Sequence, residues 1–274
     1  MNTLKNNRAL SQIWDVFQPF LLYYVVYSAV FLVLIFLCRE AGQGGIFGEW
    51  IFDNADTVTE LVSGVAMLTG ILPLLPMLRK ELAEHKRSVK TRDEKGEGGA
   101  VQAVVLTTAL AVSSSLCLNV LLALTGMVDS SASYQDVARQ QYGVVFGVGA
   151  VLFGLISPVT EEIVFRGLVF NRLRRYYPHM AAVVVSGVLF GIYHGNAVQG
   201  VYGGCMGILM AYLYERMHSL FIPCLFHGAA NLTVYAAAQS AAVHRLIFTV
   251  PGCVIFLAVS AAGIFLVERR KNLI

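Results

Sequence analysis

The chain has 274 residues, of which 57% are hydrophobic and 14% are charged, and its mean hydropathy is +0.66. Soluble domains contain about 45–50% apolar and about 25% charged residues, so this composition excludes an ordinary soluble enzyme and indicates an integral membrane protein. The net charge of +3 is too small to indicate a nucleic-acid-binding protein.

A helix needs about 20 apolar residues to cross the hydrocarbon core of a bilayer. Segments of this kind recur along the chain and predict an all-α, polytopic bundle of eight transmembrane helices. The segments are residues 17–38, 61–78, 98–128, a fourth that begins near 142 and continues past residue 162, two that divide 176–214 at Gly195 and Asn196, then 220–238 and 246–267. The first is longer than a signal-peptide core and lacks a small-residue cleavage site, so we expect it to be retained.

Loop charges predict the orientation of this bundle. With both termini in the cytoplasm, 16 Lys and Arg residues lie in cytoplasmic loops and three lie outside, with Arg166 placed inside the membrane. This asymmetry follows the positive-inside rule and supports eight spans. The strongly charged residues 79–99 are then predicted to form a mobile cytoplasmic loop, and residues 44–52 a short interfacial segment.

Small residues predict a packing seam in the sixth span. Gly200, Gly203, Gly204 and Gly207 give two overlapping Gly-x-x-x-Gly spacings. Small residues let membrane helices approach closely, so we expect this face to contact a neighbouring helix.

The five cysteines are predicted to be buried free thiols. They are odd in number, lack metal-type spacing and fall in or beside apolar segments, so we expect no disulfide and no cysteine-ligated metal.

Three spans contain polar residues that are rare inside membranes. Ionisable groups cost free energy in hydrocarbon, so they are seldom found there without a partner or a function. Glu161 lies eleven residues before Arg172, roughly 16 Å along a helix, which predicts a position near mid-membrane. The polar residues are Glu161, Glu162 and Arg166 in the fourth span, His194 in the fifth, and His227 and Asn231 in the seventh.

The fourth span contains a candidate general base. Glu161 can activate water, and the alternatives for it are a structural ion pair or a proton relay. Glu162 and Arg166 are spaced i,i+4, so they lie on one helical face and can form a buried ion pair. Arg166 is therefore predicted to have a supporting role. Glu162 can serve either the pair or the chemistry, because successive helical residues point about 100° apart.

The two histidines each allow two kinds of chemistry. His194 can hold water beside Glu161 or bind a metal, while a single histidine in an apolar span is more often a hydrogen-bonded core residue. His227 and Asn231 share a helical face and can donate hydrogen bonds to a developing oxyanion. His227 can instead be the second imidazole of a metal site. We expect Glu161, His194 and His227 to share one depth in the membrane.

The three motifs together resemble those of a known family. Glu-Glu-x-x-x-Arg at 161–166, Phe-x-x-x-His at 190–194 and His-x-x-x-Asn at 227–231 are similar to the motifs of CPBP intramembrane proteases. That family includes type II CAAX prenyl endopeptidases and bacterial Abi proteins linked to bacteriocin processing and self-immunity. The resemblance covers roughly residues 142–238, and the first three spans lie outside it.

The resemblance implies roles for the motif residues. Glu161 activates water, assisted by His194, and His227 with Asn231 stabilises the oxyanion. The glutamate at 162 and the arginine at 166 complete the first motif as supporting residues. The same resemblance leaves open a divalent metal such as zinc, held by Glu161, His194 and His227. No His-Glu-x-x-His motif or cysteine cluster adds independent support for zinc.

The resemblance also implies a domain organisation. Residues 1–141 contain the first three transmembrane helices and the basic loop 79–99, residues 142–240 contain the catalytic core of helices four to seven, and residues 241–274 contain the last helix and a basic tail.

The function implied is that of an intramembrane endopeptidase in a bacterial cell membrane. Its substrates would be membrane-associated or lipidated peptides, and no nucleic acid is expected as a partner. One alternative is a proton- or ion-coupled transporter, because buried carboxylates and histidines also build proton relays. Another is a non-catalytic bacteriocin self-immunity protein on the same fold, since a fold does not determine a function.

Overall fold

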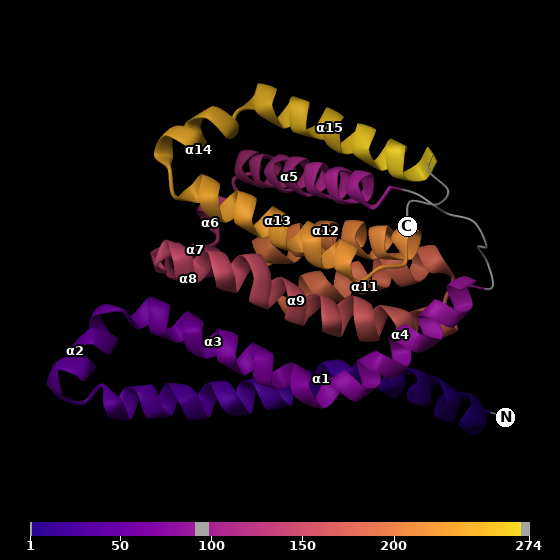
Figure 1. Ribbon diagram of the computed structural model, residues 1–274, viewed down its shortest axis with the longest axis horizontal. Coiled ribbons are helices and arrows are strands. Elements are labelled where there is room, and N and C mark those ends of the chain that lie inside the picture. The colour runs from indigo at the N-terminus through magenta and orange to yellow at the C-terminus, as the bar shows by residue number, and fades with distance from the viewer. Residues whose placement is uncertain (1, 91–98, 270–274) are drawn as a thin grey trace.

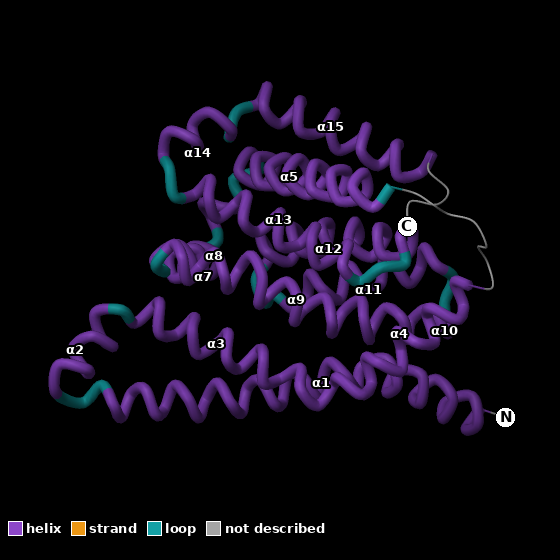
Figure 2. Tube along the Cα trace, viewed as in Figure 1, coloured by secondary structure: helices purple, strands orange, loops and turns teal. Residues whose placement is uncertain are grey.

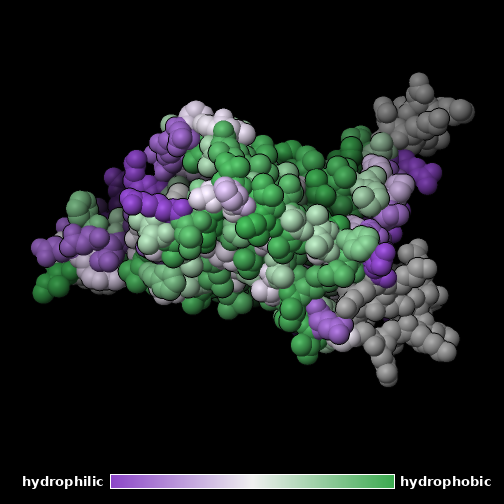
Figure 3. Space-filling model, turned by 90° about the horizontal axis from the view of Figure 1, so that it is seen from above, coloured by the Kyte–Doolittle hydropathy of each residue, from purple (hydrophilic) through white to green (hydrophobic). Residues whose placement is uncertain are grey.

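The computed structural model describes residues 2–90 and 99–269, and its regular elements in this part of the chain are all helices (Figure 2). Six of the described helical stretches are long and apolar enough to cross a membrane by length and composition. Hydrophobic side chains cover the middle of the face seen in Figure 3, with hydrophilic ones toward its two ends. The protein is therefore a multi-pass integral membrane protein, and the predicted all-α bundle is confirmed.

The N-terminal helices form a hairpin along one side of the molecule (Figure 1). A Cβ atom on Gly70 would lie 3.0 Å from the ring of Tyr23, so the glycine allows the two long helices of the hairpin to approach closely. The elements are α1 (Asn2–Ala41), α2 (Gly45–Asp53), α3 (Ala55–Ile71), the 3₁₀ turn η1 (Leu72–Leu74) and α4 (Leu75–Lys90). The short helix α2 occupies the segment predicted to be interfacial.

Residues 79–90 of the predicted cytoplasmic loop are helical, which corrects that prediction. They belong to α4, which continues the second span as far as Lys90. Glu81 of α4 forms ion pairs with Arg172 at 3.1 Å and with Arg175 at 2.8 Å, so its charge holds the helix against the bundle. Residues 91–98 of the predicted loop and 270–274 of the predicted basic tail lie outside the described residues.

The remaining helices form a bundle beside the hairpin (Figure 1). They are α5 (Ala100–Leu124), α6 (Met127–Ser130), α7 (Ala132–Gly143), α8 (Phe146–Val151), η2 (Leu152–Ile156), α9 (Ser157–Glu162), η3 (Ile163–Phe170), α10 (Asn171–Tyr176), α11 (His179–Tyr193), α12 (Ala197–Met217), α13 (Phe221–Ala238), α14 (Ala241–Ile247) and α15 (Val250–Arg269). The five cysteines are free thiols, as predicted, but only Cys117 and Cys253 are buried and Cys205 is exposed, which corrects the prediction that all five are buried.

Each predicted span corresponds to a helix or a run of helices. The fourth is α8 to α10, and the fifth and sixth are α11 and α12, which are separated where Gly195 adopts a positive φ of 75° and Asn196 caps α12. With 15 residues, α11 is about 22 Å long, shorter than the hydrocarbon core of about 30 Å. The count of eight spans and the cytoplasmic position of both termini stay predictions.

The helix from α8 to α10 contains two π-helical segments, η2 and η3, on either side of α9. In η2 the Ser157 N–H donates to the Leu152 carbonyl, five residues back. Pro158 follows and has no N–H to donate. The carbonyls of Phe153 and Gly154 are thereby left free of their usual helical donors, and both face α13.

The predicted glycine seam is confirmed as the contact between α11 and α12. A Cβ on Gly191 would lie 2.4 Å from the Gly200 carbonyl oxygen, and one on Gly207 would lie 3.0 Å from the Gly187 Cα. The two backbones touch because no side chain separates them. This contact positions the end of α11, where His194 lies.

Candidate active site

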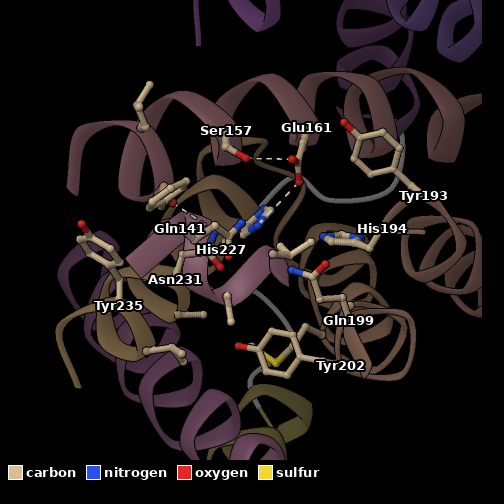
Figure 4. Close-up of a pocket in the computed structure, with 18 of the residues that line it drawn as sticks. Gln141, Ser157, Glu161, Tyr193, His194, Gln199, Tyr202, His227, Asn231 and Tyr235 are labelled. Atoms are coloured by element: carbon tan, nitrogen blue, oxygen red, sulfur yellow. Dashed lines mark hydrogen bonds and ion pairs between the residues drawn. The ribbon is translucent and has the colours of Figure 1, made fainter. Parts of the chain in front are cut away.

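A cavity of about 420 Å³ lies inside the bundle. Its wall includes Glu161, His194, His227 and Asn231, the four residues that the sequence singled out for chemistry (Figure 4). They come from α9, the end of α11 and α13, so the fold brings together motifs that are up to 70 residues apart.

Glu161 is 6% exposed and faces this cavity from α9. One carboxylate oxygen accepts a hydrogen bond from the Ser157 hydroxyl at 2.8 Å. The other oxygen lies 3.9 Å from His227 Nε2 (Figure 4). One oxygen is therefore held in place while the other remains open to the cavity.

Glu162 and Arg166 are fully buried and form the ion pair that their spacing predicted. Glu162 Oε1 lies 2.8 Å from Arg166 Nη1, and Arg166 Nη2 donates to the Gly207 carbonyl at 2.8 Å. The guanidinium also lies 4.7 Å from the centre of the Phe190 ring, at a distance suited to a cation–π contact. Arg166 thus connects the first motif to α11 and α12.

Glu162 has a second partner that the sequence did not reveal. His227 Nδ1 lies 3.0 Å from Glu162 Oε1. An ionised carboxylate only accepts hydrogen bonds, so Nδ1 is the donor and Nε2 is the nitrogen that faces Glu161 and the cavity. Glu162 therefore sets the orientation of the His227 ring.

His194 is fixed in a similar way. Its Nδ1 lies 2.8 Å from the Phe190 carbonyl, which can only accept, so Nε2 carries no proton in the neutral ring. A Cβ on Gly203 would lie 3.2 Å from this ring, so the absence of a side chain there leaves room for the imidazole. His194 and Glu161 share the cavity without a direct hydrogen bond to each other.

Asn231 is anchored by the free carbonyl in η2. Its Nδ2 donates to Phe153 O at 3.1 Å, which uses one of the two amide hydrogens. Beside this hydrogen bond the backbones of α13 and η2 are in direct contact. A Cβ on Gly228 would lie only 2.4 Å from the Gly154 carbonyl oxygen. Both contacts depend on the π turn before Pro158, and they set how near α13 lies to α9.

Replacing Gly228 with alanine is expected to destabilise the protein by about 1–3 kcal/mol, because the added methyl group forces α13 away from η2. The same shift moves the adjacent His227, so activity should fall as well. Gly147→Ala is the matched control, because a Cβ at that helical position meets no atom within 4 Å. Thermal unfolding of the two variants in detergent tests this, and equal unfolding temperatures would argue against it.

The donors suggested for a metal do not fit one ion. Among the residues that the structure describes, no group of three His, Cys, Asp or Glu side chains lies within reach of a common metal ion. Glu161, His194 and His227 therefore line a cavity without forming a ligand set.

Ser157 is a site residue that sequence reasoning missed. A serine four residues before Glu161 lies on the same helical face, and that spacing was the available signal. Ser157→Ala is expected to lower the rate of the peptide hydrolysis that the motifs imply by about tenfold, the equivalent of one hydrogen bond of about 1.4 kcal/mol. The rate should recover in Ser157→Thr, which keeps the hydroxyl. Cleavage kinetics of the two variants, compared at equal protein concentration, provide the measurement.

The fold and the cavity define a multi-pass membrane protein with an internal carboxylate–histidine site. Residues 144–233 match the family model described as Type II CAAX prenyl endopeptidase Rce1-like. Over that segment the chain is similar to the CPBP/CAAX protease family, as its motifs indicated.

One curated relative supports the same family. The Bacillus subtilis protein named "Putative membrane peptidase YdiL" is 30% identical over 84 residues, which cover 31% of this chain and 34% of that protein. The aligned segment therefore spans about a third of the length of the curated relative that it matches. No solved structure matches the chain.

Proposed function

We propose that this protein is a CAAX-type intramembrane endopeptidase that hydrolyses a peptide bond of a membrane-associated or lipidated peptide. The single observation that carries the proposal is the meeting of Glu161, His194, His227 and Asn231 in one cavity. The family match and the membrane-peptidase relative, which comes from a bacterium, support hydrolysis in a bacterial cell membrane.

In the proposed reaction, Glu161 acts as the general base. A water molecule in the cavity donates one hydrogen to the open oxygen of Glu161 and the other to His194 Nε2, so a lone pair of its oxygen is directed at the substrate carbonyl. As the C–O bond forms, Glu161 takes the first proton. When the C–N bond breaks, Glu161 gives that proton to the leaving amine, and the carboxylate is regenerated.

His227 and Asn231 stabilise the oxyanion in this proposal. When its ring carries both protons, His227 donates from Nδ1 to Glu162 and presents an Nε2–H to the cavity, because Nε2 is the nitrogen on that side. The second amide hydrogen of Asn231 is available beside it, because only one is used by the Phe153 carbonyl. Such pre-oriented donors are each worth about 10²- to 10³-fold in rate.

Glu162 and Arg166 act through other residues. Glu162 positions His227, and Arg166 compensates the buried charge of Glu162. Neither side chain lines the cavity, so both are positioning residues.

The proposal is tested by cleavage assays in proteoliposomes. Purified wild-type protein and Glu161→Ala are compared on membrane peptides with and without a prenyl group, and products are identified by mass spectrometry. Cleavage by the wild type alone is expected. Equal products from both proteins would refute the proposal. Proton- or ion-dependent uptake without cleavage would favour the transporter, and immunity that persists in Glu161→Ala would favour the non-catalytic alternative.

A further inference from the structure

The cavity extends well beyond the segment that matches the family model. Residues from α3, α5 and α7 form much of its wall, and all three helices precede residue 144. On α7 the lining residues are Tyr134, Val137, Ala138, Gln141 and Tyr142. This spacing of three and four places them on one face of the helix. The N-terminal helices therefore contribute directly to the space that a substrate would occupy.

The α3 wall contains a second cavity carboxylate, that of Glu60. Its lining residues Glu60, Ser63, Gly64 and Met67 again lie on one helical face. Ser63 contacts the Tyr27 hydroxyl at 3.1 Å, so this wall is fixed against α1. Gly64 packs against η2, since a Cβ there would lie 2.4 Å from a methyl carbon of Leu152.

Glu60 has no basic partner among the residues that the structure describes. Its carboxylate is half-buried and accepts one neutral hydrogen bond, from Gln140 Nε2 at 3.1 Å. Within residues 2–90 and 99–269, no Lys or Arg forms an ion pair with it, and none lines the cavity. Glu162 and Glu81, by contrast, are each paired with an arginine. An ionisable group in an apolar span is usually paired or functional.

On the basis of the proposed function, we propose that Glu60 forms a cation-binding subsite that accepts a lysine or arginine side chain of the substrate peptide. The ammonium or guanidinium donates charge-assisted hydrogen bonds to the carboxylate. The aliphatic stem of the side chain can lie along tyrosines of the cavity wall, such as Tyr27 and Tyr142.

The helices also give the distance between this subsite and the reacting carbonyl. The α3 helix and the helix from α8 to α10 run in the same direction (Figure 1) and touch at Gly64 and Leu152. At 1.5 Å per residue, Glu60 and Glu161 are separated by about 20 Å along the bundle, or about six residues of an extended peptide. A basic residue about six positions from the cleaved bond is therefore expected to fit best.

Binding of peptides to the Glu161→Gln variant tests the subsite without requiring cleavage. The probes are fluorescent membrane peptides with lysine, norleucine or glutamate placed four to eight residues from the cleavage position. The lysine peptide is expected to bind about tenfold more tightly than the norleucine peptide, a difference typical of one charge-assisted hydrogen bond. Adding Glu60→Gln should abolish this preference, and adding Glu60→Lys should shift it toward the glutamate peptide.

The matched control is Glu49→Gln, which removes an exposed carboxylate on α2, outside the cavity. It should keep the lysine preference. Equal affinities of the lysine and norleucine peptides would overturn the subsite, and this comparison needs no substitution at Glu60. A lysine preference that depends on Glu60 would support the subsite even if the wild type cleaved no peptide, so its failure is distinguishable from failure of the proposed function.

Discussion

Glu161→Gln is expected to lower the rate of peptide cleavage by about 10²- to 10⁴-fold, the usual contribution of a general base. Glutamine has nearly the same size, and its amide oxygen can still accept the Ser157 hydrogen bond. It cannot take a proton from water at neutral pH, so the effect should fall on the chemical step. Single-turnover cleavage in proteoliposomes, with binding measured separately, checks this.

The control for Glu161→Gln is Glu49→Gln, which makes the same change at an exposed position on α2. Its activity should equal that of the wild type. Substantial activity in Glu161→Gln, with an unchanged unfolding temperature, would remove Glu161 from the proposed role and leave His194 or His227 as the group to test next.

Arg166→Ala should have the largest effect on stability. Both members of its ion pair are 0% exposed, so truncation leaves Glu162 buried with an uncompensated charge. Breaking a buried pair in this way costs about 3–5 kcal/mol. The Gly207 carbonyl also loses the hydrogen bond from the guanidinium, and His227 loses the fixed orientation that Glu162 provides. Thermal or denaturant unfolding in detergent measures the change.

Arg139→Ala is the matched control for Arg166→Ala. Its ion pair with Asp136 is also intrahelical, but the two side chains are 79% and 74% exposed. Such surface pairs contribute about 0–1 kcal/mol, so little change is expected. Arg166→Lys should not restore the wild type, because an ammonium lacks the fork that reaches Glu162 and Gly207 together. Similar stabilities of Arg166→Ala and Arg139→Ala would contradict the argument.

Local spacing predicted the parts of the site that lie within one helix. The i,i+4 spacing correctly predicted the pair of Glu162 and Arg166, and the glycine spacing correctly predicted a helix contact in α12. Both inferences need only the knowledge that these segments are helices, and the apolar pattern of the sequence had already indicated this. The position of α4 was predicted wrongly, because a high density of charge was interpreted as a loop although Glu81 pairs with two arginines of α10.

Contacts between distant helices could not be predicted from spacing. The hydrogen bond between Glu162 and His227 joins residues 65 apart, and the one between Asn231 and Phe153 joins residues 78 apart. The second contact does have a local cause, because Pro158 and the π turn before it free the carbonyls that α13 meets. The position of Glu60 in the cavity depends on how α3 packs against η2. No motif in the sequence of the N-terminal helices predicted that position.

The most direct measurement of the central claim is cleavage of reconstituted membrane peptides in ¹⁸O-labelled water under single-turnover conditions. If Glu161 activates water, the wild type produces new C-terminal carboxylates that carry ¹⁸O in the first turnover, and Glu161→Gln produces almost none. Unlabelled product from the wild type would show that the oxygen came from the protein, and equal labelled product from both proteins would show that another group activates the water. Either result would contradict the account given for this site.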